Sequence, residues 1–379
     1  IFLRTVLGNS THARLFVTEA ISGCKVVRTT ERPSPSLLRL EADGGRFIEL
    51  VFAEPKVLRL RGRGLGLRLR MWTVPPVNSA YPGPGRRIVV NNSPNGVKMM
   101  VTPLVGSVAV DAPWDGVKSS RIALDLLPDG SGAMEAALEE YTSAWRERSY
   151  PGTFDEAVAQ VAGEFRAFAD AIPDVGEPYR PAGALAAYLL WSNIVEPDGY
   201  LKRRAIFMSK NMMTGVWSWD HGFNAMALAR GNPALAWDQM MLMFDLQAPD
   251  GSLPDRVNDR LITWAHNKPP VHGWMLRRLM AMSAWFRDRK RLAEIYGPLG
   301  RWTEFWFTYR DDDRDGLPQY NHGNDSGWDN ATPFLAGVPL ESPDLSAFLV
   351  VQMDVLADVA GKLGKPEEAK RWKARADAL

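Results

Sequence analysis

Two aspartates in one stretch without regular periodicity are the first candidates for chemistry. Asp325 and Asp329 lie four residues apart in YNHGNDSGWDNATPF (320–334), which has neither a helical nor a strand period. Hydrolysis of a glycosidic bond takes two carboxyl groups on opposite sides of the anomeric carbon, roughly 6.5–9.5 Å apart in the inverting geometry. The acid member must be protonated at the working pH, which burial against an aromatic wall favours. Trp328, directly before Asp329, offers such a wall.

A second stretch, NMMTGVWSWDHGFNAMAL (211–228), places aromatic residues around another aspartate. Trp217, Trp219 and Phe223 surround Asp220 just before an apolar helical run. Asp220 could cap that helix, since aspartate is a preferred N-cap residue. Capping leaves the two flanking tryptophans unexplained, whereas a sugar ring needs both an apolar face and polar partners.

A third stretch combines APDGSLPDRVND (248–259) with HNKPPVHGW (266–274). Its Pro-Asp-Gly and Pro-Pro sequences set rigid turns. With these turns, Lys268, His272 and Trp274 could face a common cavity. The alternative for Lys268 is an ordinary solvated loop lysine.

An acidic run precedes the first stretch. Asp311, Asp313, Asp315 and Gly316 match the first half of a calcium loop, DxDxDG. The twelfth position is His322, where an EF-hand carries a bidentate Glu, so the pattern predicts either a structural Ca²⁺ site or a carboxylate-rich turn. No organic cofactor is expected.

Composition excludes several classes of protein. The 379 residues carry a formal net charge of +1, which gives no reason to expect nucleic acid or an anionic membrane as a partner. No apolar stretch is long enough to span a membrane. The single Cys24 fits a reducing compartment. We therefore expect a bacterial cytoplasmic protein, although a signal peptide upstream of Ile1 would be invisible here; the sequence does not indicate an oligomeric state.

The elements that position these stretches differ between the two halves of the chain. Residues 1–130 contain short β-like runs, such as RFIELVF (46–52), RRIVVNN (86–92) and SVAVDA (107–112), separated by turn residues. In KVLRLRGRGLGLRLRM (56–71) the leucines change from even to odd positions at the glycines, which predicts a strand pair or a bulge. Arginines on the opposite face suggest a half-solvated strand, with a nucleic-acid surface as the alternative. This half is expected to form a β-sandwich.

Helical spacing begins near Met134. Met134, Leu138, Tyr141 and Trp145 recur at helical steps, as do apolar residues from Phe154 to Phe168, so 131–182 is interpreted as a helical connector. From there the predicted helices, with no strand between them, are 183–195, 221–230, 233–247, 270–286, 289–309, 345–363 and 366–379. Paired helices joined by alternately short and long loops indicate an α/α toroid or solenoid. Eleven of the 14 tryptophans lie in this half, either as core residues or as sugar-binding faces.

Taken together, VWSWDHGFNAMAL, PDGSLPD…NKPPVHGW and NHGNDSGWDN resemble the signature segments of glycoside hydrolase family 63, in the same clan as trehalase and mannosylglycerate hydrolase. The resemblance covers about residues 183–379. It implies an (α/α)6 barrel with an inverting α-glycosidase site of the α-glucosidase type, acting on a di- or oligosaccharide. A complete barrel has twelve helices, so 183–379 would be its incomplete N-terminal part.

The resemblance also implies roles for single residues. Asp329 would be the general acid, and Asp220 would bind the sugar in the −1 subsite. Trp217, Trp219 and Phe223 would form the wall of that subsite, and Lys268, His272 and Trp274 would line it. Asn324 and Asp325 would contact sugar hydroxyls and Trp328 would be a further wall. Asp325 stands where the family often has Glu.

The general base of the family would lie on the order of two hundred residues after the acid, hence beyond Leu379. Inside the chain the nearest alternatives are Glu304 and Glu341. Two other functions are weighed against hydrolysis. One is a catalytically incomplete barrel that only binds carbohydrate. The other is a sugar isomerase or epimerase, which would require His221, His272 and His322 to converge on one sugar.

Overall fold

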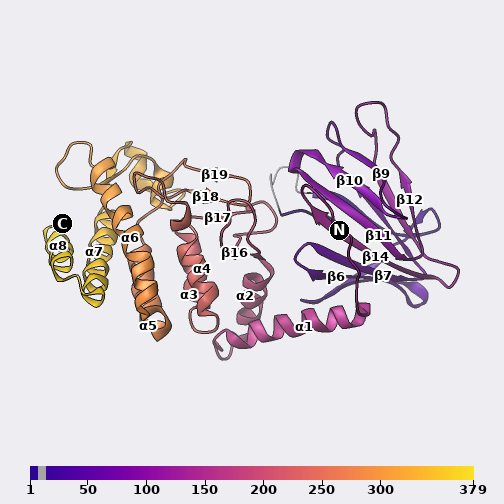
Figure 1. The fold of residues 1–379 in the computed structure, drawn as a ribbon, viewed down its shortest axis with the longest axis horizontal. Helices are drawn as coiled ribbons and strands as arrows, with labels where there is room; N and C mark the ends of the chain where they lie inside the picture. Colours follow the sequence, from indigo (N-terminus) through magenta and orange to yellow (C-terminus); the bar gives the residue numbers. More distant parts are fainter. Residues whose placement is uncertain (7–13) are drawn as a thin grey trace. The chain divides into compact units, whose positions relative to one another are not determined.

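The computed structural model describes residues 1–6 and 14–379, which form two compact units, Ile1–Ala169 and Asp170–Leu379 (Figure 1). The first unit is built from antiparallel sheets and the second mainly from helices. The predicted combination of a β-rich part and a helical part is therefore confirmed. Helix α1 (Phe154–Ala171) carries the chain from the first unit into the second.

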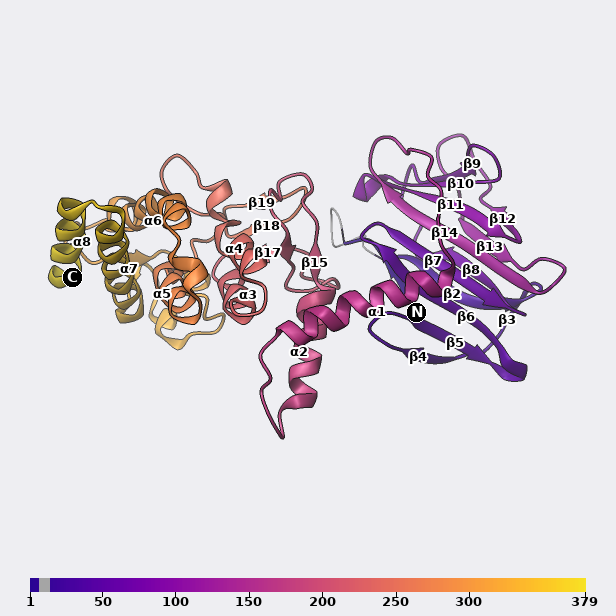
Figure 2. The same ribbon diagram turned by 60° about the horizontal axis from the view of Figure 1, so that its bottom comes forward.

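Two large antiparallel sheets make up the first unit (Figure 2). One has the order β1–β2–β8–β13–β12, with β3 paired to β2; its strands are β1 (Phe2–Arg4), β2 (Arg14–Ser22), β3 (Lys25–Val26), β8 (Gly66–Met71), β12 (Ser107–Asp111) and β13 (Ala123–Leu127). The other has the order β4–β5–β6–β7–β14–β11–β10–β9; its strands are β4 (Thr30–Pro33), β5 (Leu38–Ala42), β6 (Arg46–Glu54), β7 (Val57–Arg63), β9 (Ser79–Pro82), β10 (Ile88–Asn92), β11 (Val97–Val105) and β14 (Ala133–Tyr141).

Both sheets contribute side chains to one apolar core, which is the packing of a β-sandwich. The expected strand pair at 56–71 is wrong in one respect: β7 and β8 belong to different sheets. The chain turns between them at Gly64, whose φ of +69° favours glycine. The leucines change from even to odd positions here, because the turn changes which residues of the following strand point into the core. Leu60 of β7 and Leu67 of β8 both reach the shared core.

Several arginines of these two strands are paired with acidic side chains. Arg61 lies 2.7 Å from both Glu49 and Asp155, and Arg68 lies 2.7 Å from Asp125. These arginines are neutralised on the outer faces of the sheets, in agreement with a half-solvated strand.

The helix expected near Met134 is wrong, since residues 133–141 form β14 between β7 and β11. A step of four residues, as from Met134 to Leu138, keeps two side chains on the same face of a strand as well as of a helix. Pairing with two neighbouring strands decides between these structures. The helical connector predicted for 131–182 is therefore a strand in its first part, whereas the helix predicted from Phe154 is confirmed as α1.

The predicted helices of the second unit are all present, with ends that differ by a few residues. They are α2 (Arg180–Ser192), α3 (Asp220–Leu228), α4 (Pro233–Met241), α5 (His272–Met282), α6 (Arg289–Tyr309), α7 (Pro343–Leu363) and α8 (Pro366–Ala378). Among the described residues, no helix is long and apolar enough to cross a membrane.

Short strands occur in the loops of this unit, contrary to expectation. They are β15 (Ile194–Val195), β16 (Ala205–Ile206), β17 (Val216–Trp217), β18 (Arg256–Val257), β19 (Ile262–Thr263), β20 (Gln319–Tyr320) and β21 (Leu340–Glu341). Each has only two residues, too few to show a period in the sequence.

Alternate helices of the second unit pack in two rows. Helix α3 contacts α5, and α5 contacts α7, while α4 packs on α3 and both α6 and α8 pack on α7. Figure 1 shows these helices side by side as an open array running from α2 to α8. Helices α3, α5 and α7 each begin directly after one of the three long loops, so the fold brings the N-terminal ends of these helices and the candidate residues together.

Candidate functional site

The first loop (210–219) is joined to the second loop (247–271) by backbone pairing. Strands β17 and β18 pair Val216 with Val257, and the Ser218 N–H donates to the Asp255 carbonyl at 2.8 Å. This pairing fixes the residues just before Asp220 against the second loop. It also explains why short strands occur between helices.

The second loop is tied to the third loop (310–342) at adjacent residues. The Asn267 N–H donates to Asp325 Oδ1 at 3.0 Å, and Lys268 Nζ donates to the Asn324 carbonyl at 2.6 Å. His266, the residue before Asn267, has its ring centroid 4.7 Å from that of His322. Lys268 is 8% exposed, so the alternative of a solvated loop lysine is wrong.

The third loop returns to the first at Gly327. Gly327 has a φ of +72°, and a Cβ at this position would overlap the indole of Trp219. Trp219 itself has φ +70° and ψ −44°, a conformation that costs a non-glycine residue about 1–3 kcal/mol. The surrounding contacts hold this strained residue directly before Asp220.

Aromatic residues from the first turns of α3 and α5 form a cluster beside these loops. Phe223 contacts Trp219 at 5.8 Å and Trp274 at 6.1 Å between ring centroids. Phe223 is 44% exposed, so the cluster is accessible to a ligand. Trp217 lies nearby in sequence under the guanidinium of Arg256, whose Cζ is 4.5 Å from its centroid. The structure thus brings together Trp219, Phe223 and Trp274.

Asp220 is the first residue of α3, and Trp219 occupies the N-cap position, so the capping alternative for Asp220 is wrong. Burial raises the pKa of Asp220 to about 6. Its own backbone N–H and the Lys268 ammonium oppose this rise, whereas the charges of Asp329 and Asp255 add to it. Asp329 is exposed, and its carboxylate lies close enough to Asp220 for its charge to raise the pKa of Asp220.

Asp255 is a buried residue of the site that was not predicted. Its carboxylate lies 3.8 Å from Lys268 Nζ, and burial raises its pKa. His266 and Arg310, which flank Asp325, were also not predicted. Asp255 stands inside the quoted LPDRV segment, but nothing in the sequence distinguishes it from an ordinary turn aspartate.

Asp325 has a position different from that of an exposed sugar contact. It is 2% exposed, and its carboxylate accepts backbone hydrogen bonds from Asn267, Asn321 and His322. Asn324 contributes its carbonyl to Lys268 and lies 3.4 Å from His266 through its side chain. Trp328 is 63% exposed.

The histidines separate into two groups. His221 and His272 are fully buried with ring centroids 5.2 Å apart; burial lowers the pKa of His221 to about 4 and holds that of His272 well below its usual value. His322 is exposed and its ring lies tilted against that of His266 instead. The described residues therefore do not bring His221, His272 and His322 to one accessible sugar site. Being fully buried, His272 lies beneath the site rather than lining it.

Tryptophan serves both predicted purposes. Trp237, Trp302, Trp306 and Trp372 are buried in the helical core, while the cluster around Phe223 is at the loops. Two hollows of about 390 and 550 Å³ lie elsewhere, the first beside Arg59 and Tyr150 and the second beside Arg203. Neither is lined by a predicted site residue.

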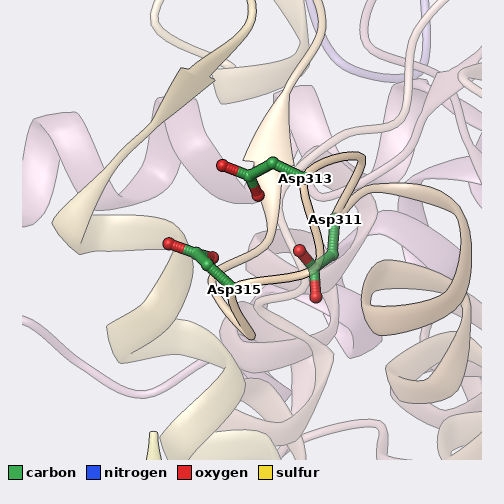
Figure 3. Close-up of side chains that lie close together, drawn as sticks. All are labelled: Asp311, Asp313 and Asp315. Atoms are coloured by element: carbon green, nitrogen blue, oxygen red, sulfur yellow. The ribbon is translucent and has the colours of Figure 1, made fainter.

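The acidic run forms a compact group of carboxylates (Figure 3). One ligand oxygen from each of Asp311, Asp313 and Asp315 lies within 4.8 Å of the others. The Gly316 N–H donates to Asp311 Oδ2 at 3.2 Å, and Gly316 has a φ of +95°, which suits the sharp turn at this point of a calcium loop. Strand pairing sets Gln319 opposite Glu341, a fourth acidic residue near the group. Partial desolvation and the charges of the three aspartates raise the pKa of Glu341.

Comparison with known families decides the class of the second unit. Residues 213–379 match the family model described as the mannosylglycerate hydrolase MGH1-like glycoside hydrolase domain. This part of the chain is thus similar to a glycoside hydrolase domain. It contains all three long stretches except for the first residues of the first one, so the resemblance to glycoside hydrolase family 63 is confirmed for these residues. No curated protein matches the chain significantly.

Solved structures share the fold of the helical second unit and of the sheets before it. A bacterial glucoamylase complexed with acarbose has 10% identity and a TM-score of 0.59, over 97% of this chain and 61% of that chain. A family 92 glycosyl hydrolase, ccman5, has 14% identity and a TM-score of 0.56, over 98% and 55%. The family 63 mannosylglycerate hydrolase of Thermus thermophilus matches 51% of this chain and 63% of its own length, with 20% identity and a TM-score of 0.42. The chain thus spans about three fifths of the length of these proteins.

Proposed function

We propose that the glycoside hydrolase domain takes part in hydrolysing an α-glycosidic bond of a di- or oligosaccharide with inversion at the anomeric carbon. The observation that carries this proposal is the convergence of three loops that bring Asp220 and the charge of Asp329 together beside the Trp219–Phe223–Trp274 cluster. The apolar face of a sugar ring can stack on such aromatic side chains while its hydroxyls meet carboxylates. The matched family supports the same class of reaction.

In the proposed reaction Asp329 gives its proton to the glycosidic oxygen as the bond from that oxygen to the anomeric carbon breaks. A water molecule adds to the opposite face of that carbon, and a second carboxylate takes the proton released by the water. Asp220 holds hydroxyls of the sugar in the −1 subsite. We propose that the second carboxylate lies outside residues 1–379 and that these residues belong to an (α/α)6 barrel.

The structure supports neither internal alternative for this base. Glu341 is exposed beside the acidic run, and Glu304 is ion-paired with Arg375 at 2.7 Å on α6. If residues 1–379 bind sugars without hydrolysing them, the binding-only function applies to this chain by itself. A sugar isomerase is not proposed, since the histidines are separated.

The direct test follows hydrolysis of α-glucosides and α-mannosides, mannosylglycerate included, by proton NMR. The proposal expects the β-anomer of the free sugar as the first product, appearing before mutarotation. The panel is run on residues 1–379 and on protein that also supplies a carboxylate opposite Asp329. Release of the α-anomer first would exclude inversion, and binding of sugars without hydrolysis in both proteins would exclude the enzyme.

The same assay measured across pH tests Asp220. An ionised carboxylate is the better acceptor for sugar hydroxyls, so binding needs the deprotonated form, which predominates above the pKa of about 6. We expect kcat/KM to rise about tenfold per pH unit below pH 6 and to level off above it, and Asp220→Asn to abolish this acid limb. A fall of kcat/KM above pH 6 that Asp220→Asn removes would instead make Asp220 a proton donor.

We propose in addition that the acidic run binds a structural Ca²⁺, which would take carboxylate oxygens from Asp311, Asp313 and Asp315. Oxygen ligands of this kind are those that Ca²⁺ prefers. Millimolar Ca²⁺ is expected to raise Tm by several degrees, because a ligand of the native state alone stabilises it. Asp313→Asn should remove most of the shift, whereas Asp358→Asn on the outside of α7 should keep it. An equal Tm with Ca²⁺ and with a chelator would contradict the proposal.

A further inference from the structure

Asp325 is the most thoroughly connected carboxylate of the three loops. It lies in a short 3₁₀ turn (Gly323–Ser326) and is 2% exposed. Its Oδ2 accepts from the N–H groups of Asn321 and His322, both at 3.0 Å, which closes the turn on itself. Its Oδ1 accepts from the Asn267 N–H of the second loop, also at 3.0 Å. One side chain thus fixes the shape of its own turn and joins it to another loop.

The Arg310 guanidinium and the His266 ring lie beside the buried carboxylate. Arg310 Nη1 lies 3.8 Å from Asp325 Oδ2, and His266 Nδ1 lies 3.6 Å from Oδ1. Arg310 also donates to the side-chain oxygen of Asn267. Asn267 is therefore held twice, by its backbone on Asp325 and by its side chain on Arg310.

A second connection lies directly beside the first. Lys268 follows Asn267, and Asn324 precedes Asp325; Lys268 Nζ donates to the Asn324 carbonyl at 2.6 Å. Because the two connections are adjacent in both loops, the second loop cannot slide along the third without breaking them together.

The turn after Asp325 transmits this placement to Asp329. Ser326 Oγ accepts from the Trp328 N–H at 3.0 Å and donates to the Gly323 carbonyl at 2.7 Å. Gly327 lies against the indole of Trp219, so that even a methyl group would not fit between them. Two contacts therefore hold the backbone between Asp325 and Asp329 in place. One is made by the Ser326 hydroxyl, and the other is made by Gly327 against Trp219, the residue before Asp220.

We propose that Asp325 is a positioning residue, whose buried carboxylate sets the segment carrying Asp329 against Asp220 and Lys268 without touching the sugar. Three backbone N–H groups donate to its oxygens, the Arg310 guanidinium and the His266 ring lie beside them, and Asp325 is only 2% exposed, so the carboxylate is shielded from a sugar hydroxyl. The resemblance to family 63 suggested a sugar contact at this position; the structure assigns it a different role. This inference rests on the proposed function only for the catalytic consequence.

The structural arm of the test is hydrogen exchange in Asp325→Asn. An asparagine side chain presents one acceptor oxygen and one NH2 group, so it can serve either Asn267 or the pair Asn321 and His322, but not both. Peptides covering 264–271 and 319–330 are expected to exchange at least about tenfold faster than in the wild type. Gln239→Met is the matched control, because it removes a buried side chain that links α4 to β16 away from these loops.

Equal exchange in Asp325→Asn and in the wild type, or equal loosening in Asp325→Asn and Gln239→Met, would overturn the proposal. If Asp325→Asn does not fold, Asn267→Pro provides the test, because proline lacks the backbone N–H that donates to Asp325 Oδ1 while the carboxylate itself stays in place. It should speed exchange in 264–271 by more than Gln239→Met does, and no such difference would overturn the proposal.

The catalytic arm separates positioning from contact. In Asp325→Asn we expect kcat to fall by about 10²-fold with KM changed less than about twofold, because the misplaced acid acts only in the transition state. A KM raised about tenfold or more with kcat unchanged would show a direct sugar contact and overturn the proposal. If the wild type hydrolyses no glycoside at all, the proposed function fails, and the exchange measurement still decides whether Asp325 holds the loops.

Discussion

Asp329→Asn is expected to lower kcat for a natural α-glycoside by about 10³-fold in protein that carries both carboxyl groups of the catalytic pair. A natural glycoside leaves as an alkoxide unless a proton reaches its oxygen, and the amide cannot supply that proton. Asp329 is exposed, so its replacement should disturb folding little. The measurement is the rate of sugar release at saturating substrate, with Tm recorded for both proteins.

Aryl α-glycosides with an acidic leaving group sharpen this test. The phenolate of such a substrate leaves without protonation, so Asp329→Asn should lower the rate of hydrolysis of the aryl glycoside much less than that of the natural substrate. Asp358→Asn, which removes an exposed ion pair with Lys362 on α7, is the control and should keep both rates. Undiminished hydrolysis of natural and aryl substrates alike would remove Asp329 from the role of general acid.

The sequence predicts those features that local patterns determine. Helix α6 is expected at 289–309 and has those ends, because apolar residues recur along its whole length. The aromatic cluster is also predictable, since Phe223 and Trp274 lie in the first turns of helices that the pattern locates. Residues near the starts of neighbouring helices on one side of an array must come together.

Long-range contacts decide the features that the sequence does not predict. Met134 and Leu138 satisfy a strand as well as a helix, and only pairing with β7 and β11 selects the strand. Asp325 and Asp329 look alike in one loop, yet Asp325 is buried by Asn267 from 58 positions earlier and Asp329 is exposed. His272 stands in the middle of a candidate motif but faces the core. Burial of a polar side chain depends on which distant backbone groups reach it, which a local pattern does not encode.

The close approach of α5 and α7 predicts a large loss of stability in Gly273→Ala. Gly273 is the second residue of α5, and a Cβ there would overlap the Cα of Gln352 on α7. The Gly273 N–H also donates to Gln352 Oε1 at 3.0 Å, and Gln352 Nε2 donates to Thr303 on α6 at 2.9 Å. A methyl group would push α5 from α7 and break this buried chain of hydrogen bonds. We expect the free energy of unfolding to fall by about 3 kcal/mol.

Gly361→Ala on α7 is the matched control, because Gly361 is exposed and a Cβ there would meet no atom within 4 Å. Alanine in an open helical position should raise the free energy of unfolding by about 0.5–1 kcal/mol. Urea unfolding followed by tryptophan fluorescence measures both, since 11 of the 14 tryptophans lie from Trp191 onwards. Equal midpoints for Gly273→Ala and wild type would contradict the packing. Because Trp274 follows Gly273 directly, molecules of Gly273→Ala that remain folded should also bind sugar more weakly: the contact that stabilises the helices is the one that sets the aromatic cluster in place.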